Sequence, residues 1–416
     1  TALMKTDLKE LKKLLRTDSR VYVGGSCAEP RGLLDAIRTN CQSSSGVNYT
    51  QFPLGAVNQL DLTRLTPEAT MSVFFMTPFI QDSLKEGRVN FIPMQMRTVF
   101  DFLETTKLDV ALLQAARDRN GVLRYGPNVD FLDAVLANAK HIIVEENSGF
   151  VAPIGTPLVD TGQVDLLLDV GTEKPVFPVG DIDDVSKKIG EQIATLIKDG
   201  DCLQTGIGAV PAAMLANLGG RSDLGFHGGL MDDGVLALIR DGNMTGSRKA
   251  IDNGKHVLGM ALGSEDLLDW LAHDPLAESV VFKSANYTHE VSVIGQLDNF
   301  VSVNSAVEID LMGQVNAEVA GSKQISGTGG SVDFMRSAKA SSGGRSIVAM
   351  ASTARGGTVS RIVPQVTLVT ALRTDVDIVV TEFGIAELRN ECLASRAERL
   401  IEIAHPEFRD ELKASV

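Results

Sequence analysis

The sequence predicts an α/β protein made of two similar domains with mainly parallel sheets. Its 416 residues are more than one ordinary hydrophobic core accommodates, and they suffice for two. Short apolar runs alternate with helical stretches, a pattern typical of strands buried on both faces of a parallel sheet. A unit of helix, strand, glycine loop and helix also occurs twice, about 180 residues apart.

The repeated unit sets the expected domain boundary. Its two copies place a helix, a strand, a glycine loop and a second helix at 5–16, 21–23, 24–30 and 32–37, and at 184–198, 202–204, 206–211 and from Ala212. We therefore expect an N-terminal domain at 1–182 and a C-terminal domain at 183–416. Further buried strands are expected at 110–113, 141–145, 256–261, 346–350 and 376–381.

Composition excludes several classes of function. The chain has 53 acidic and 39 basic residues, a net charge of −14, whereas a nucleic-acid partner needs a basic surface. Its four cysteines form no CxxC pair and its histidines show no metal-binding spacing, so neither disulfides nor a metal site is expected. No apolar run reaches the ~18–20 residues needed to span a bilayer. The polar, helical residues 1–10 do not resemble a signal peptide, which favours a cytoplasmic protein.

A first candidate ligand loop is Gly206-Ile207-Gly208-Ala209-Val210, followed by Pro211. It lies between a predicted strand and a predicted helix. Glycine lets a backbone approach a ligand closely, and the N-terminus of the following helix favours an anion. The segment matches neither a Walker A motif nor the dinucleotide fingerprint, and a purely structural turn remains open at this point.

A second candidate ligand loop is Ser326-Gly327-Thr328-Gly329-Gly330. Small side chains here expose consecutive N–H groups, which can form an anion-binding nest. Between the two loops, Asn304 follows a strand-like run and could hydrogen-bond a ligand amide. Glu308, four residues further, is a candidate catalytic carboxylate, although a carboxylate in such a segment more often has a structural partner.

Taken together, these segments resemble the acetyl-CoA hydrolase/CoA-transferase family, which includes 4-hydroxybutyrate and acetate CoA-transferases. The matching stretches span nearly the whole chain: 23–30, 204–211, 227–236, 302–314, 326–334, 352–364, 379–388 and 400–412. The resemblance implies two tandem CoA-transferase-like domains with the active site in the cleft between them. It assigns contacts with coenzyme A to Gly206–Val210, Asn304 and Gly327. It also implies an acyl-CoA substrate, a small carboxylic acid as acceptor, and a homo-oligomer such as a homodimer.

The family's chemistry depends on one glutamate. That residue attacks the acyl-CoA thioester, and the resulting anhydride is converted to a glutamyl-CoA thioester. It lies in a stretch resembling His-Thr-Glu-Met-x-x-Asp-Gly. Here the stretch is His227-Gly228-Gly229-Leu230-Met231-Asp232-Asp233-Gly234, so the position of the nucleophile is Gly229.

Three interpretations follow from Gly229. Another carboxylate or an activated water serves, which makes the protein a thioester hydrolase or another CoA-thioester enzyme. Alternatively, the chain binds CoA esters without converting them. In the third, a relocated carboxylate supports conventional transfer, with Asp232, Glu308 and Glu29 as candidates. The absent glutamate also makes His227 a candidate for proton transfer, and the Gly228–Gly229 N–H groups candidates for an oxyanion hole.

Overall fold

A computed structural model describes residues 5–416, with side chains from residue 7 onward. The predicted helical start at residues 1–4 lies outside this range. The chain forms two compact units. Unit 1 comprises the N-terminal residues up to Pro178 together with Leu258–Asn286, and unit 2 comprises Val179–Val257 together with Tyr287–Val416. The predicted division at 182/183 gives two domains that are each continuous in sequence. In the structure, by contrast, the segment 258–286 belongs to unit 1 although residues of unit 2 precede it in the chain.

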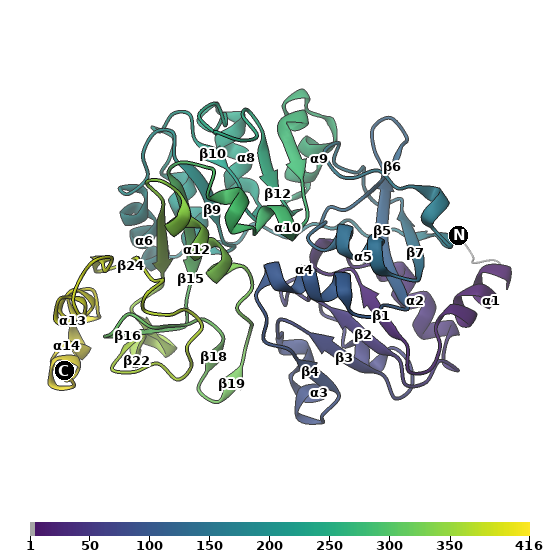
Figure 1. Cartoon of the computed structure of the whole chain (residues 1–416), viewed down its shortest axis with the longest axis horizontal. Coiled ribbons are helices and arrows are strands. Elements are labelled where there is room, and N and C mark those ends of the chain that lie inside the picture. The colour runs from purple at the N-terminus through teal and green to yellow at the C-terminus, as the bar shows by residue number, and fades with distance from the viewer. Residues whose placement is uncertain (1–4) are drawn as a thin grey trace. The chain divides into compact units, whose positions relative to one another are not determined.

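Unit 1 is built on an eight-stranded sheet in the order β4-β3-β2-β1-β5-β7-β8, with β6 on β5 (Figure 1). All pairs along this path are parallel, and only β6 is antiparallel. The strands are β1 Arg20–Val23, β2 Asn48–Gln51, β3 Thr70–Val73, β4 Val89–Phe91, β5 Val110–Arg117, β6 Leu123–Tyr125, β7 His141–Asn147 and β8 Leu166–Gly171.

Helices cover this sheet because their apolar faces pack on its buried strands. They are α1 Lys5–Leu14, α2 Arg31–Asn40, α3 Gln81–Lys85, α4 Met96–Thr105 and α5 Leu132–Asn138. The returning segment adds α9 Glu265–His273 and β14 Val280–Phe282. The core collects Leu33, Leu34 and Ile37 of α2 against Val21, Val110 and Ile143 of three strands.

Unit 2 is built on a six-stranded sheet in the order β10-β9-β15-β20-β24-β25, in which only β25 is antiparallel. The strands are β9 Cys202–Thr205, β10 Gly225–Phe226, β15 Phe300–Ser305, β20 Arg345–Ala349, β24 Ile378–Thr381 and β25 Gly384–Glu387. A three-stranded sheet joins β16 Glu308–Asp310, β17 Val315–Asn316 and β23 Ile362–Val363.

The helices of unit 2 are α6 Asp184–Ala194, α7 Ala209–Ala216, α8 Asp233–Arg240, α11 Val291–Ile294, α12 Ser331–Ala340, α13 Leu393–Glu402 and α14 Arg409–Ala414. Helix α7 begins at Ala209 and not at Ala212 as the sequence predicted. Pro211 therefore occupies the first helical turn, where its missing N–H would have had no intrahelical acceptor. The predicted strand 256–261 is divided into β12 His256–Leu258 and β13 Met260–Ala261.

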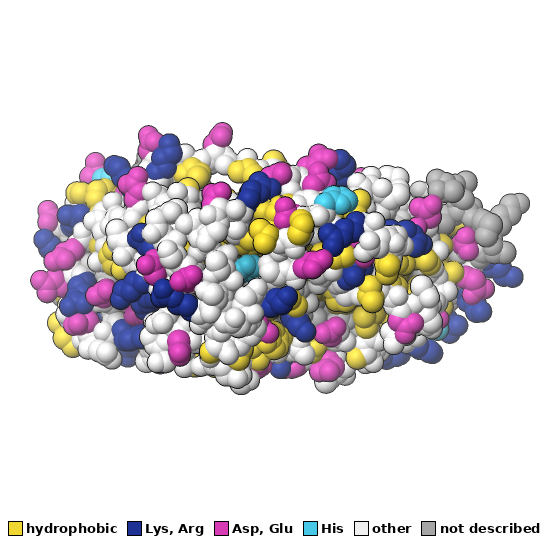
Figure 2. Space-filling view, turned by 90° about the horizontal axis from the view of Figure 1, so that it is seen from above, with side chains coloured by type: hydrophobic (Ala, Val, Ile, Leu, Met, Phe, Trp, Pro, Cys, Tyr) yellow, Lys and Arg dark blue, Asp and Glu magenta, His cyan; other side chains and the backbone are white. Residues whose placement is uncertain are grey.

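Charged side chains of both signs lie on the surface of the molecule (Figure 2). On the face seen in Figure 2, Lys and Arg side chains are interspersed with Asp and Glu side chains. Within residues 5–416, no helix combines the length and apolar character that crossing a bilayer requires.

Candidate active site

The predicted ligand loops of unit 2 gather at one edge of its sheet. The 206–208 loop follows β9, the 227–232 segment follows β10, and Asn304 lies near the end of β15. The 326–330 loop precedes α12, which packs on β15 and β20 and leads into β20. Because such a helix runs back against the strands, its N-terminus lies at their carboxyl ends, where parallel sheets bind ligands.

A pair of amide side chains joins the ends of β9 and β15. Gln204 Nε2 donates to Asn304 Oδ1 at 3.2 Å, and Asn304 Nδ2 donates to Gln204 Oε1 at 3.0 Å. A Cβ at Gly206 would lie 3.5 Å from Asn304 Oδ1, and one at Gly228 would lie 3.0 Å from Gln204 Cγ. Three separate segments therefore meet at this pair. The sequence places Gln204 in a predicted strand without singling it out, because its pairing with Asn304 follows from the register of β9 and β15.

The 206–208 loop needs glycine for its backbone conformation. Gly208 has φ +127° and ψ −174°, a region open essentially only to glycine. The loop turns there into α7, so that the first N–H groups of this helix lie beside it. This arrangement suits an anionic group of a ligand.

The 326–330 loop is fixed at both ends. Ser326 Oγ donates to Ala317 O at 2.8 Å, and Ser331 Oγ donates to Thr328 O at 3.0 Å. Gly329 has φ +56°, and Gly330 forms the N-cap of α12. The Thr328 hydroxyl oxygen is buried and has no hydrogen-bond partner within residues 5–416. The loop is therefore an ordered turn with an unused polar atom.

The imidazole of His289 lies against both Gly229 and Gly330. A Cβ at Gly229 would lie 3.1 Å from His289 Cε1 and 3.2 Å from its Nε2. A Cβ at Gly330 would lie 2.6 Å from the Cδ2 and Nε2 of the same ring. The ring packs on Phe334 at a centroid distance of 4.4 Å, and its Nδ1 shares a hydrogen bond of 2.7 Å with Thr288 Oγ1. Sequence reasoning missed His289, since no spacing relates it to the two glycines.

The side chain of His227 is fully buried. Its Nε2 lies 3.2 Å from Thr288 O, and because a carbonyl only accepts, Nε2 carries the proton. Burial, followed by the charge of Lys249, lowers the pKa of His227 to about 4. The ring is therefore neutral at neutral pH. His227 contacts Thr288, which in turn contacts His289. The proton-transfer role suggested for His227 stays a prediction.

The two candidate carboxylates of unit 2 have structural partners. Asp232 is the N-cap of α8, where its Oδ1 accepts from the backbone N–H groups of Gly234 at 3.1 Å and Val235 at 3.2 Å. Burial is the main cause that raises the pKa of this carboxyl. Glu308 Oε1 accepts from Thr367 N at 2.7 Å and from Asn316 Nδ2 at 3.1 Å. Both roles are those of carboxylates that hold loops in place.

The oxyanion donors suggested by the sequence are only partly available. The Gly228 N–H donates to Val257 O at 3.0 Å, next to the parallel bridge between His227 and Val257. It is thus engaged in the backbone ladder. Of the two N–H groups considered, that leaves the one of Gly229.

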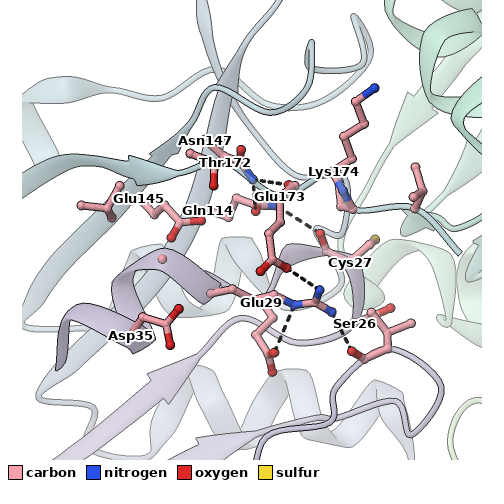
Figure 3. A pocket seen from close by; sticks show the side chains of 16 residues that line it. Ser26, Cys27, Glu29, Asp35, Gln114, Glu145, Asn147, Thr172, Glu173 and Lys174 are labelled. Atoms are coloured by element: carbon pink, nitrogen blue, oxygen red, sulfur yellow. Dashed lines mark hydrogen bonds and ion pairs between the residues drawn. The ribbon is translucent and has the colours of Figure 1, made fainter. Parts of the chain in front are cut away.

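Unit 1 contains a polar cavity of about 100 Å³ (Figure 3). Glu29 lines it together with residues of β5, β7 and β8. Its Oε2 accepts from Gln51 Nε2 at 2.8 Å, and its buried Oε1 lies 3.6 Å from Arg31 Nε without a hydrogen bond to any described residue. Burial raises the pKa of Glu29 to about 7, and likewise that of Glu145, whose Oε1 accepts from Leu33 N at 2.7 Å.

The geometry defines an α/β protein with two parallel-sheet units and a glycine-lined candidate site at the carboxyl edge of the second sheet. Residues 4–160 match the N-terminal domain of acetyl-CoA hydrolase/transferase, and residues 263–416 match its C-terminal domain. The chain belongs to this family. It is accordingly an enzyme of the CoA-transferase and acyl-CoA hydrolase class, and the resemblance seen in the sequence is confirmed.

Individual relatives agree with this assignment. The chain is 34% identical over 404 residues to a 4-hydroxybutyrate coenzyme A transferase of Clostridium kluyveri, covering 96% of this chain and 94% of the relative. The crystal structure of RipA from Yersinia pestis matches with a TM-score of 0.89 and 30% identity over 98% of each chain. That of a 4-hydroxybutyrate CoA-transferase from Porphyromonas gingivalis matches with a TM-score of 0.79 and 31% identity, covering 98% of this chain and 95% of the other.

Proposed function

We propose that the protein hydrolyses acyl-CoA thioesters without a covalent glutamyl intermediate. The observation that supports this function most directly is the pairing of Gly229 with His289. The position assigned to the family's nucleophile has no side chain, and an imidazole ring fills the adjacent space. A site of this composition favours attack by water over attack by a carboxylate.

Coenzyme A is bound in this proposal by the glycine loops. The phosphate groups lie near the N-termini of α7 and α12, where helical N–H groups and the helix dipole favour negative charge. Asn304 is held by Gln204 and keeps one N–H for an amide oxygen of the pantetheine arm. We assign the N–H of Gly229 the role of hydrogen-bond donor to the thioester oxygen in this proposal.

The substrate class comes from the relatives. Those at 34% identity are named for the transfer of coenzyme A to or from 4-hydroxybutyrate, butyrate and acetate. We infer a short-chain acyl-CoA as the substrate, with the free acid and coenzyme A as products. The reaction consumes one water, which breaks the C–S bond, and the thiolate leaves as the thiol.

A panel of acyl-CoA esters with a thiol reagent tests this function. Hydrolysis predicts release of free thiol without an added acid, and an unchanged rate when acetate or butyrate is supplied. Borohydride, which reduces a glutamyl-CoA thioester, is expected to leave the protein active. Thiol exchange that depends on an added acid, together with inactivation by borohydride, would instead establish conventional transfer through a relocated carboxylate.

A further inference from the structure

We propose that His289 is the catalytic base of this site, standing in for the absent glutamate. The inference rests on the proposed hydrolytic function and adds to it the residue that activates water. It depends on contacts within unit 2, among Gly229, Gly330, Thr288 and Phe334.

The two glycines are explained by the imidazole ring. Gly330 has φ −98° and ψ 2°, which other residues also adopt, and Gly229 is outside the left-handed region. Neither backbone conformation requires glycine. A Cβ at either position would lie closer to the His289 ring than ordinary van der Waals contact allows, at 3.1 Å for Gly229 and 2.6 Å for Gly330. The imidazole ring therefore occupies space that a side chain at either position would need.

The Cε1–Nε2 edge of the ring borders the position of a Gly229 side chain, and Nε2 also borders that of a Gly330 side chain. Nδ1 is engaged with Thr288 Oγ1 at 2.7 Å, and Phe334 packs on the ring at 4.4 Å between centroids. Nε2 lies 3.2 Å from the point where a side chain of residue 229 would begin. The side chain of the glutamate that the resemblance assigns to this position would begin at the same point. A nitrogen base therefore borders the place where the thioester would be attacked.

The step proceeds as follows. His289 Nε2 takes one proton from water while the water oxygen bonds to the thioester carbonyl carbon. The tetrahedral intermediate then expels the thiolate of coenzyme A, and the C–S bond breaks. The imidazolium returns its proton to the sulfur. Water and acyl-CoA are consumed, the carboxylic acid and the thiol are formed, and the imidazole is neutral again.

Two conservative variants test the base. H289N keeps an amide nitrogen at the depth of Nδ1, where it can still bond Thr288, and H289Q places an amide near Nε2 without a basic nitrogen. Both are expected to lower kcat for thiol release about 100-fold or more, the range typical of a general base, and to bind coenzyme A as tightly as wild type in calorimetry. H273N, at an exposed histidine of α9, is the matched control.

Chemical rescue separates a base from a space-filling ring. In H289A, added imidazole is expected to restore thiol release, whereas pyrazole, of the same shape but far weaker basicity, is not. Equal rescue by both, or wild-type kcat in folded H289N, would overturn the assignment to His289 while leaving hydrolysis intact. A wild-type protein that releases no thiol from any acyl-CoA would instead overturn the proposed function itself.

Discussion

Glycine serves two different purposes at this site. At Gly208 the backbone itself requires it, because φ is +127°. At Gly229 and Gly330 the requirement comes from a neighbour, since the His289 ring occupies the space of a side chain. If residue 229 is the position of the family's nucleophile, as the resemblance implies, the His289 ring occupies space that the side chain of a glutamate there would need.

This packing predicts that restoring the glutamate alone fails. In G229E the new Cβ meets the His289 ring at 3.1–3.2 Å, which we expect to cost about 1–3 kcal/mol of stability and to misplace the carboxylate. The double variant G229E/H289A removes the obstruction. It should form a glutamyl-CoA adduct when given acyl-CoA, detectable by intact mass and removed by borohydride, whereas G229E should not.

G220E is the matched control, because a Cβ at Gly220 meets nothing within 4 Å. It is expected to unfold like wild type and to form no adduct. An adduct in G229E alone would show that His289 moves aside readily, and the packing argument would then be wrong.

The buried carboxyl of Glu29 predicts a pH-dependent stability. Its pKa is raised from 4.5 to about 7, so between these values the folded state keeps a proton that the unfolded state has lost. The free energy of unfolding therefore falls as pH rises through this window, and the loss is complete above pH 7. Relative to E29Q, wild type should lose roughly 1–3 kcal/mol between pH 5 and pH 8.

Urea unfolding at the two pH values measures this difference. Asp130 and Glu145 shift stability in the same direction, and His227 and His256, with pKa lowered to about 4, shift it in the opposite direction. All four are present in both proteins and cancel in the comparison. E104Q, at an exposed position of α4, is the control for the loss of one carboxyl. An unchanged gap between wild type and E29Q would contradict the argument.

At the scale of elements, the repeated unit was the most reliable guide. Helix, strand, glycine loop and helix occur in both units, as α1-β1-α2 and α6-β9-α7. Local signals suffice there, because buried parallel strands are continuous apolar runs and helices show a regular apolar face. Helix α7 begins at Ala209, three residues before the predicted start at Ala212, because Pro211 fits the first helical turn.

The site was only half visible in the sequence. The 206–208 and 326–330 loops and Asn304 are predicted as ligand contacts from their small or amide side chains, and the structure brings them to one sheet edge. Gln204 and His289 were missed, since each acquires its role from contacts with residues distant in sequence. His289 lies 60 positions after Gly229 in the sequence, and no local pattern predicts that the two residues are in contact.

At the scale of the whole molecule, the sequence did not predict that the segment 258–286 belongs to unit 1. Within unit 1 it supplies backbone partners to the N-terminal region: Val129 N donates to Gly259 O at 2.8 Å, and Ala285 N donates to Asp130 O at 2.7 Å. Gly155 packs so closely on Val280 O that an added Cβ would lie 2.1 Å away. The segment is thus built into unit 1, although unit 2 residues precede it in the chain.

These contacts predict that unit 1 needs the segment in order to fold stably. A fragment of residues 1–178 should lack these backbone partners, expose apolar residues such as Ala152 that pack with Leu268, and unfold at a lower temperature. Joining residues 258–286 to it through a flexible Gly/Ser linker should raise the midpoint in circular dichroism. A linked peptide of the same composition in scrambled order is the control. If the fragment alone unfolded at the same temperature as the linked form, the segment would contribute nothing to unit 1, and the boundary at 182/183 would be the better description of the molecule.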